Sequence, residues 1–248
     1  MQNKTQLITQ NLKDYILYTA ALSQWEIHDT FDGIVFTIND SRESLFNFVF
    51  CKTELSIPQT LDYLKTRNRE ATWVMESTIK SNVLEKYNIK HASTPKKMLL
   101  KIRNYLLPAD TIPNLKLITV NSNQLLEQLD LYTSRIFYHR SGIVSTFFRG
   151  LPNCSTQLKF FLVSLDDKIV GTCGIYIQDN VVGFYSDGVL PIYRNQGIGT
   201  QMVLERIKIA QESKCQYAVA HCMKPSVNLY KRLGFQVLGN LYLYTSTV

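Results

Sequence analysis

The chain has 248 residues, of which 45% are hydrophobic and 11% aromatic, enough to bury the core of one large domain or two small ones. Charged residues make up 19%, with 11 glycines and 7 prolines, which excludes disordered, collagen-like and low-complexity classes. The formal net charge of +7 is divided almost evenly about Val120. This dispersed excess does not indicate nucleic-acid binding, and it suits an anionic ligand equally well.

The cysteines are scattered and include no CxxC pair, which indicates neither a zinc site nor a disulfide framework. They are Cys51, Cys154, Cys173, Cys215 and Cys222. We therefore expect no bound metal and a reducing compartment. The first residues lack the apolar stretch of a signal peptide, and no uncharged apolar run approaches the length of about 20 residues that spans a membrane. The sequence thus predicts a soluble, cytoplasmic protein without a membrane partner.

The first part of the chain reads as mixed α and β. Strand-like runs are residues 33–38, 45–50 and 98–102, and short helices are expected at 58–65 and 80–87. Pro108 and Pro113 then disfavour regular structure between them. We place a domain boundary there, with an N-terminal α/β domain over residues 1–110 and a second domain over 115–248.

The second part alternates strands and helices. After a strand at 116–120 and a helix at 122–134, strands are expected at 160–165, 169–177 and 181–190, the last two joined as a hairpin across Asp179 and Asn180. A glycine-bearing loop leads into a helix over 198–212. A strand at 217–220, a helix over 226–233 and a strand at 235–244 complete the pattern. This order predicts an α/β fold with at least one parallel crossover.

The loop before the 198–212 helix is the most informative stretch of the sequence. It reads V-L-P-I-Y-R-N-Q-G-I-G-T over residues 189–200. Backbone N–H groups at a helix start form an anion site, and glycines let that backbone approach a phosphate. No Walker pattern occurs, and the third glycine of a dinucleotide fingerprint is replaced by Met202. The remaining motif is Arg194-x-x-Gly197-x-Gly199.

This motif resembles the acyl-CoA loop of the GCN5-related N-acetyltransferase (GNAT) superfamily, [RQ]xxGx[GA]. The hairpin, the V-x-P-x-Y-R stretch before the loop and the later L-Y-K-R-L-G-F at 229–235 occur in the same order as in that superfamily. The resemblance covers the second half of the chain. It implies the GNAT acyl-CoA N-acyltransferase fold, a mixed central sheet flanked by helices. The first part is similar, more faintly, to the degenerate GNAT-like domain of some members, acting as a lid or as a scaffold.

The resemblance implies acetyl-CoA as cosubstrate. The strand before the loop would splay from its neighbour, the pantetheine arm would pair with the freed backbone, and the Val189 N–H would face the thioester carbonyl. Residues implied to contact the cosubstrate are Val189, Leu190, Pro191, Arg194, Asn195, Gln196, Gly197, Ile198, Gly199 and Thr200. Asn228 is added to them, although it lies inside the helix whereas the superfamily carries an asparagine shortly before it.

Tyr230 is the expected general acid, because a tyrosine hydroxyl can protonate the departing thiolate. The alternative is an aromatic packing role. Asp187 is the expected general base, with Ser186 and Tyr185 as other polar candidates, although turn solvation explains Asp187 equally well. His221 is a further candidate base. A covalent mechanism through Cys222 is not expected, because no base partner is evident.

Residues 131–150 are expected to build the acceptor site, where basic and aromatic side chains interleave; an amphipathic helix with a solvated basic face is the alternative. The basic members are Arg135, His139, Arg140 and Arg149. Taken together, the sequence predicts an N-acetyltransferase that transfers acetyl from acetyl-CoA to a primary amine by direct attack. The alternative is a catalytically silent acyl-CoA-binding sensor.

Overall fold

The computed structural model describes residues 4–38, 41–108, 112–148, 150–151 and 157–247, and their strands form two mixed sheets. The first has the order β1 (Glu26–Asp29), β2 (Gly33–Thr37), β3 (Phe48–Cys51), β4 (Ala71–Met75), β13 (Tyr242–Ser246) and β5 (Ile89–Ser93). The second has the order β12 (Gln236–Asn240), β6 (Lys96–Lys101), β11 (Tyr217–Cys222), β10 (Val181–Val189), β9 (Lys168–Gln178), β8 (Leu158–Leu165) and β7 (Leu115–Thr119). The predicted mixed α/β architecture is confirmed.

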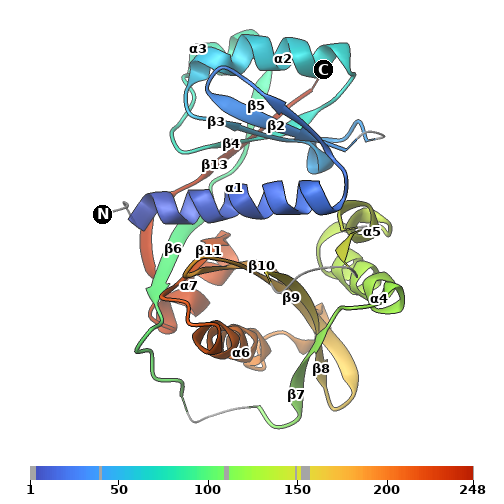
Figure 1. The fold of residues 1–248 in the computed structure, drawn as a ribbon, viewed down its shortest axis with the longest axis vertical. Coiled ribbons are helices and arrows are strands. Elements are labelled where there is room, and N and C mark those ends of the chain that lie inside the picture. The colour runs from blue at the N-terminus through green and yellow to red at the C-terminus, as the bar shows by residue number, and fades with distance from the viewer. Residues whose placement is uncertain (1–3, 39–40, 109–111, 149, 152–156, 248) are drawn as a thin grey trace.

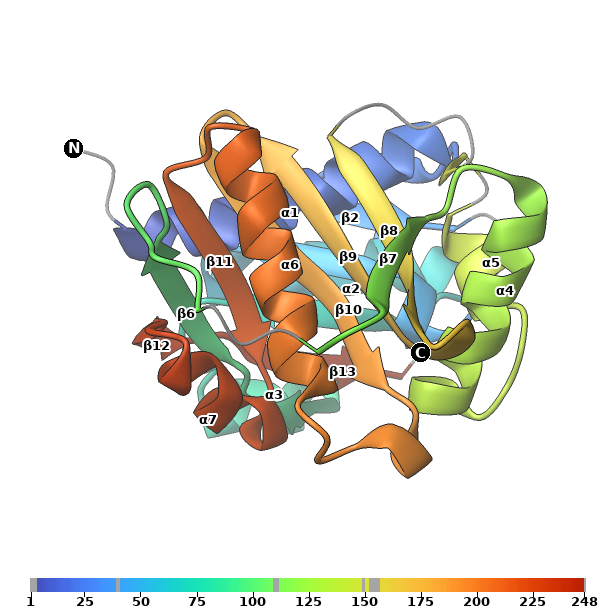
Figure 2. The ribbon, with the colours of Figure 1, turned by 90° about the horizontal axis from the view of Figure 1, so that it is seen from below.

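Helices cover both sheets and fill the space between them (Figure 1). The outer face of the six-stranded sheet packs against α2 (Ile57–Thr66) and α3 (Ser81–Tyr87). Between the sheets lies α1 (Lys4–Leu22), joined at one end by α4 (Asn123–Thr133) and α5 (Ile143–Phe147). The other face of the seven-stranded sheet is covered by α6 (Ile198–Glu212) and α7 (Lys224–Arg232), as Figure 2 shows. Short helical turns are η1 (Ser44–Phe46), η2 (Glu54–Ser56), the π-helical η3 (Ser134–Tyr138) and η5 (Pro191–Tyr193).

The two sheets exchange strands across the expected domain boundary. Strand β6 comes from the first part of the chain but lies between β12 and β11 in the seven-stranded sheet. Conversely, β13 lies between β4 and β5 in the six-stranded sheet. The division into residues 1–110 and 115–248 stays a prediction. Strands β6 and β13 each lie in the sheet that is formed mainly by the other part of the chain.

Two expected strands differ from the structure. Residues 235–244 form two strands in different sheets, because the chain leaves β12 after a register shift at Gly239 and the Leu241 N–H bonds the Pro95 carbonyl instead. Residues 44–46 are helical and β3 begins only at Phe48. The reason is Asn47, whose buried side-chain amide donates to the carbonyls of Glu43 and Glu70 and fixes a bend before the strand.

Helix α1 was not expected, because its buried stripe mixes apolar and polar side chains and carries no strong apolar period. The buried residues are Ile8, Asn11, Tyr15, Ile16, Thr19 and Ala20. Their spacing of three to four residues still places them on one side, against both sheets. The expected helices at 58–65, 80–87, 122–134 and 198–212 correspond to α2, α3, α4 and α6, and the expected hairpin is formed by β9 and β10.

Candidate active site

Strands β10 and β11 separate at one end of the seven-stranded sheet. Their parallel pairing runs from Val181 and Tyr217 to Phe184 and Ala220 and stops there. A bulge follows on β10, where Ser186 adopts a left-handed conformation with φ of 56°. Because β9 still pairs with β10 beyond the bulge, the last residues of β10 have a neighbour on one side and a gap on the side of β11.

The backbone of Val189 faces this gap. The next residue, Leu190, donates its N–H to the Val170 carbonyl at 2.8 Å, on the β9 side. Successive residues of an antiparallel strand direct their N–H groups to opposite sides, so the Val189 N–H is directed away from β9. Its carbonyl oxygen accepts a bond of 3.0 Å from Nε of Arg194, which ties the loop to the strand.

The glycine-bearing loop leads directly from the gap into α6. Asn195 and Gly197 both have positive φ, 62° and 80°, and Gly197 caps the helix. Arg194, Asn195, Gln196 and Gly197 are exposed, and the first turn of α6 contains no acidic side chain. The first N–H groups of a helix have no partner within it, so this turn suits an anionic group. A Cβ on Gly199 would lie 3.2 Å from Cδ1 of Leu229, so α6 and α7 approach closely here.

Asp187 is half-buried; it projects from the bulge toward α6 and α7 and joins a polar cluster with two buried side chains. Arg206 of α6, fully buried, binds both carboxylate oxygens, with 2.6 Å between Nη2 and Oδ2. The Tyr230 hydroxyl donates to the same Oδ2. Burial, followed by the nearby Asp187 carboxylate, raises the pKa of Tyr230 well above its ordinary value. The tyrosine therefore remains protonated at neutral pH.

The structure brings three of the expected residues together. Asp187 and Tyr230 are hydrogen-bonded, and Val189 lies two residues beyond Asp187 on the same strand. Asn228 is exposed on α7. Tyr185 faces the opposite side of the sheet, where its hydroxyl donates to Oδ1 of Asn11 at 2.7 Å.

His221 lies one residue beyond the last pairing of β11 with β10. Although part of the residue is exposed, both ring nitrogens are buried and lack a hydrogen-bond partner among the described residues. Burial, with the nearby Lys97, lowers the pKa of His221 to about 3, so the imidazole is neutral at pH 7. The Cys222 thiol is also neutral, because burial raises its pKa to about 12.

The segment expected to build the acceptor site packs against the bulge. A Cβ on Gly188 would lie 2.6 Å from Cζ of Phe137, so the absence of a side chain lets η3 approach the strand one residue before Val189. Phe137 and Tyr138 are 42% and 38% exposed. Among the basic residues, Arg140 pairs with Glu43 and Arg135 lies over the Tyr132 ring, while Arg149 lies outside the described residues.

Sequence reasoning missed Arg206 and the contact of Phe137 with Gly188. Arg206 had a signal: it lies four residues after Met202 and four before Ala210, in the middle of the apolar stripe of α6. A charge at such a position requires a buried partner. The contact of Phe137 with Gly188 had no signal in the sequence, because it depends on how η3 packs against a distant strand.

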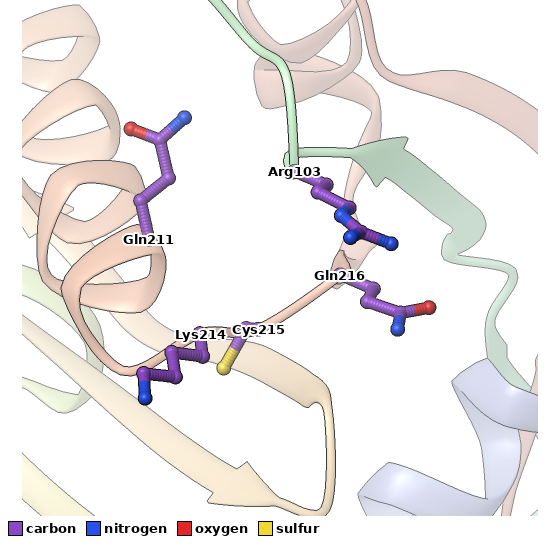
Figure 3. A pocket seen from close by; sticks show the side chains of 5 residues that line it. All are labelled: Arg103, Gln211, Lys214, Cys215 and Gln216. Atoms are coloured by element: carbon purple, nitrogen blue, oxygen red, sulfur yellow. The ribbon is translucent and has the colours of Figure 1, made fainter.

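A surface pocket of about 390 Å³ lies at the opposite end of α6, remote from the loop. Figure 3 shows its lining side chains, Arg103, Gln211, Lys214, Cys215 and Gln216. The gap, the loop and the Asp187 cluster are not part of it. Within the ranges that the structure describes, no three His, Cys, Asp or Glu side chains gather as a metal site, and no helix there is long and apolar enough to cross a membrane.

Residues 127–235 match the family model "Acetyltransferase (GNAT) family", so the chain carries a GNAT-family domain. This stretch contains the bulge, the loop and Tyr230. No curated protein matches the sequence.

Solved structures extend the likeness in fold to the first part of the chain. A GCN5-related N-acetyltransferase from Kribbella flavida has a TM-score of 0.73 at 14% identity, covering 100% of this chain and 97% of that one. A GCN5-related N-acetyltransferase from Sphaerobacter thermophilus has a TM-score of 0.61 at 14% identity, covering 86% of this chain and 76% of that one. A tandem GNAT protein from the clavulanic acid biosynthesis pathway has a TM-score of 0.58 at 10% identity, covering 86% of this chain and 78% of that one. At these identities the likeness shows the fold alone.

Proposed function

We propose that the protein is an N-acetyltransferase that uses acetyl-CoA and transfers its acetyl group to a primary amine by direct attack. The observation that carries this proposal is the gap between β10 and β11, with the Val189 N–H directed into it and the exposed start of α6 beside it. This arrangement offers one hydrogen-bond donor for a carbonyl and a set of amides for a diphosphate.

The residues around the gap fit acetyl-CoA as cosubstrate. The amides of residues 194–200 would hold the pyrophosphate, and the open backbone of Val189, Leu190 and Pro191 would lie beside the pantetheine arm. The Val189 N–H would stabilise negative charge that develops on the thioester oxygen. We retain Asn228 as a cosubstrate contact, because it lies exposed on α7, the helix that approaches the loop.

Tyr230 is proposed as the general acid. It carries its proton at neutral pH, and α7, which packs on β11, brings it to Asp187 on β10. We propose that Asp187 orients this hydroxyl. Both oxygens of Asp187 are already bound by Arg206 and one of them also by Tyr230, and removal of the amine proton by Asp187 stays a prediction.

The same ion pair favours the second candidate, an acyl-CoA-binding sensor without turnover. Because Asp187 is paired with Arg206, the bulge offers no unpaired carboxylate that could act as a base. For either function we propose a cytoplasmic location, on the sequence grounds given above, and an amine-bearing acceptor as the partner of the enzyme.

Calorimetric titration with acetyl-CoA, CoA and ATP tests the proposal. We expect acetyl-CoA and CoA to bind and ATP not to bind. Release of free thiol is then measured with a panel of primary amines that includes amino acids, polyamines and a lysine peptide. Binding without thiol release from any of them would favour the sensor, and failure of both CoA species to bind would reject both functions.

A further inference from the structure

Arg206 is an unusual residue to find in the core of this sheet. It is 0% exposed and lies on the apolar stripe of α6, where an aliphatic side chain would pack without any electrostatic penalty. Its guanidinium donates to the carbonyls of Met202 and Gly174, each at 3.1 Å, and lies 4.3 Å from the centre of the Phe184 ring. Every part of the side chain is thus held in one position.

The group that Arg206 holds is Asp187. Two nitrogens of the guanidinium meet the two carboxylate oxygens, an arrangement that fixes the plane of the carboxylate as well as its position. The Tyr230 hydroxyl donates to Oδ2, one of the oxygens already bound by Arg206. Arg206 therefore determines where the acceptor for the Tyr230 proton lies.

The titratable groups that face this cluster from neighbouring strands are thiols. Cys173 of β9 and Cys222 of β11 interact with both Asp187 and Arg206. Burial raises the pKa of each thiol to about 12, so both are neutral between pH 5 and 9. Neither thiol therefore adds a charge beside the pair of Asp187 and Arg206 in that range.

We propose that Arg206 is a positioning residue for the acyl transfer, which binds both oxygens of Asp187 and thereby fixes the Tyr230 hydroxyl at the gap between β10 and β11. This inference rests on the proposed function. Arg206 touches no reacting atom and acts through Asp187 on Tyr230.

The proton transfer explains why a buried cation is needed. When the C–S bond of the thioester breaks, its electron pair stays on sulfur, and the Tyr230 proton moves to that sulfur. This leaves a phenolate beside the carboxylate of Asp187, two negative groups next to each other, until the phenolate regains the proton that the acceptor nitrogen releases. Arg206 compensates this charge and keeps the two oxygens from separating.

A double-mutant cycle with Arg206→Lys and Tyr230→Phe tests the inference. Lysine keeps the positive charge but loses the planar fork. In the otherwise unchanged protein we expect Arg206→Lys to lower kcat for thiol release about tenfold, because the hydroxyl is no longer fixed. The Kd for acetyl-CoA should change less than about twofold, since Arg206 lies about two turns along α6 from the loop. In the Tyr230→Phe protein the same substitution should change kcat less than about twofold.

An equal loss of kcat in both backgrounds would overturn the inference, because a merely structural role does not depend on Tyr230. Lys208→Met, on an exposed position of the same helix, is the control and should leave kcat unchanged. If Arg206→Lys does not fold, as judged by circular dichroism, Arg206→Met is combined with Asp187→Asn to remove the whole ion pair. The pair of substitutions should lower kcat no more than Asp187→Asn alone, and a further tenfold loss would contradict the inference.

Failure of the proposed function can be distinguished from failure of this inference. If the unaltered protein binds neither acetyl-CoA nor CoA, the proposed function fails, whereas the double-mutant cycle tests only the role of Arg206.

Discussion

Tyr230 is the residue on which the chemical interpretation depends most directly. Its ring packs edge-on against Phe235, so the side chain also contributes to the core, while the hydroxyl alone reaches Asp187. Replacing it by phenylalanine keeps the packing and removes only the proton donor. The two roles that the sequence left open can therefore be measured separately.

For Tyr230→Phe we expect kcat for thiol release to fall about 100-fold, because the leaving thiolate loses its general acid. The calorimetric Kd for acetyl-CoA should stay close to that of the unaltered protein. Equal rates of thiol release from the two proteins would remove Tyr230 from the mechanism and leave it a packing residue.

His221 predicts an acid sensitivity of the fold. The pKa of His221 is lowered to about 3 in the folded protein, against an ordinary value of 6.5, so below pH 6.5 the unfolded chain binds a proton that the folded chain does not. The free energy of unfolding therefore falls as the pH falls through this window. Between pH 7 and pH 5 His221 accounts for about 2 kcal/mol of that loss.

His221→Leu should remove this contribution, and it also replaces two buried nitrogens that lack partners. We expect the variant to lose less stability between pH 7 and pH 5, measured by urea unfolding at both values. His91→Leu, at an exposed position on β5, is the control. The prediction fails if the unaltered protein and His221→Leu show the same dependence on pH.

At the scale of elements, the junction between β10 and α6 places a helix start beside an open strand end. Gly197 makes this junction because its φ of 80° is disfavoured for residues with a Cβ. Gly197→Ala should raise the Kd for acetyl-CoA about tenfold, or about 1.4 kcal/mol, by shifting the amides of the first turn. Calorimetry measures the change.

Gly142 offers a matched control for that prediction. Its φ is 87°, and a Cβ there would meet nothing within 4 Å. Gly142→Ala carries the same kind of backbone strain, about 1–2 kcal/mol, in another part of the molecule. Like Gly197→Ala, it should lower the melting temperature, but unlike Gly197→Ala it should leave the Kd for acetyl-CoA unchanged. A similar loss of binding in both variants would show that general destabilisation is responsible.

The elements that the sequence predicted are those whose signals are local. The hairpin of β9 and β10 has its turn residues in place, and the loop is marked by glycines at fixed spacing before an apolar helix. The partner of Asp187 is 19 residues away and depends on how α6 is rotated against the sheet. The strand assignments of β6 and β13 depend on long-range pairing, which alternation of side chains does not encode.

At the scale of the whole molecule, the strand exchange makes the two sheets depend on each other. Met98 and Ile102, both 0% exposed, belong to the core beneath α6 although they precede the expected boundary. Lys97, on the same strand, is buried and pairs with Glu76, which follows β4 of the other sheet. Neither sheet retains all its strands if the chain is divided between residues 110 and 115.

A fragment of residues 115–248 should therefore fail to fold. It lacks β6, so β12 loses its partner and β11 loses its antiparallel neighbour. We expect no cooperative unfolding transition in near-ultraviolet circular dichroism, whereas the whole chain should unfold in a single transition. A sharp transition in the fragment would mean that the remaining strands close the sheet without β6.

The position of β13 also has a consequence for biosynthesis. A ribosome releases the residues of β1 to β5 first, yet the sheet that they form lacks an interior strand until residues 242–246 have emerged. Nascent chains usually fold domain by domain from the N-terminus. Here the earlier half must remain incomplete, with the edges of β4 and β5 open, while residues 127–235, the stretch that matches the GNAT family, are synthesised. Chaperones that bind unpaired strands would therefore bind the nascent chain during that interval.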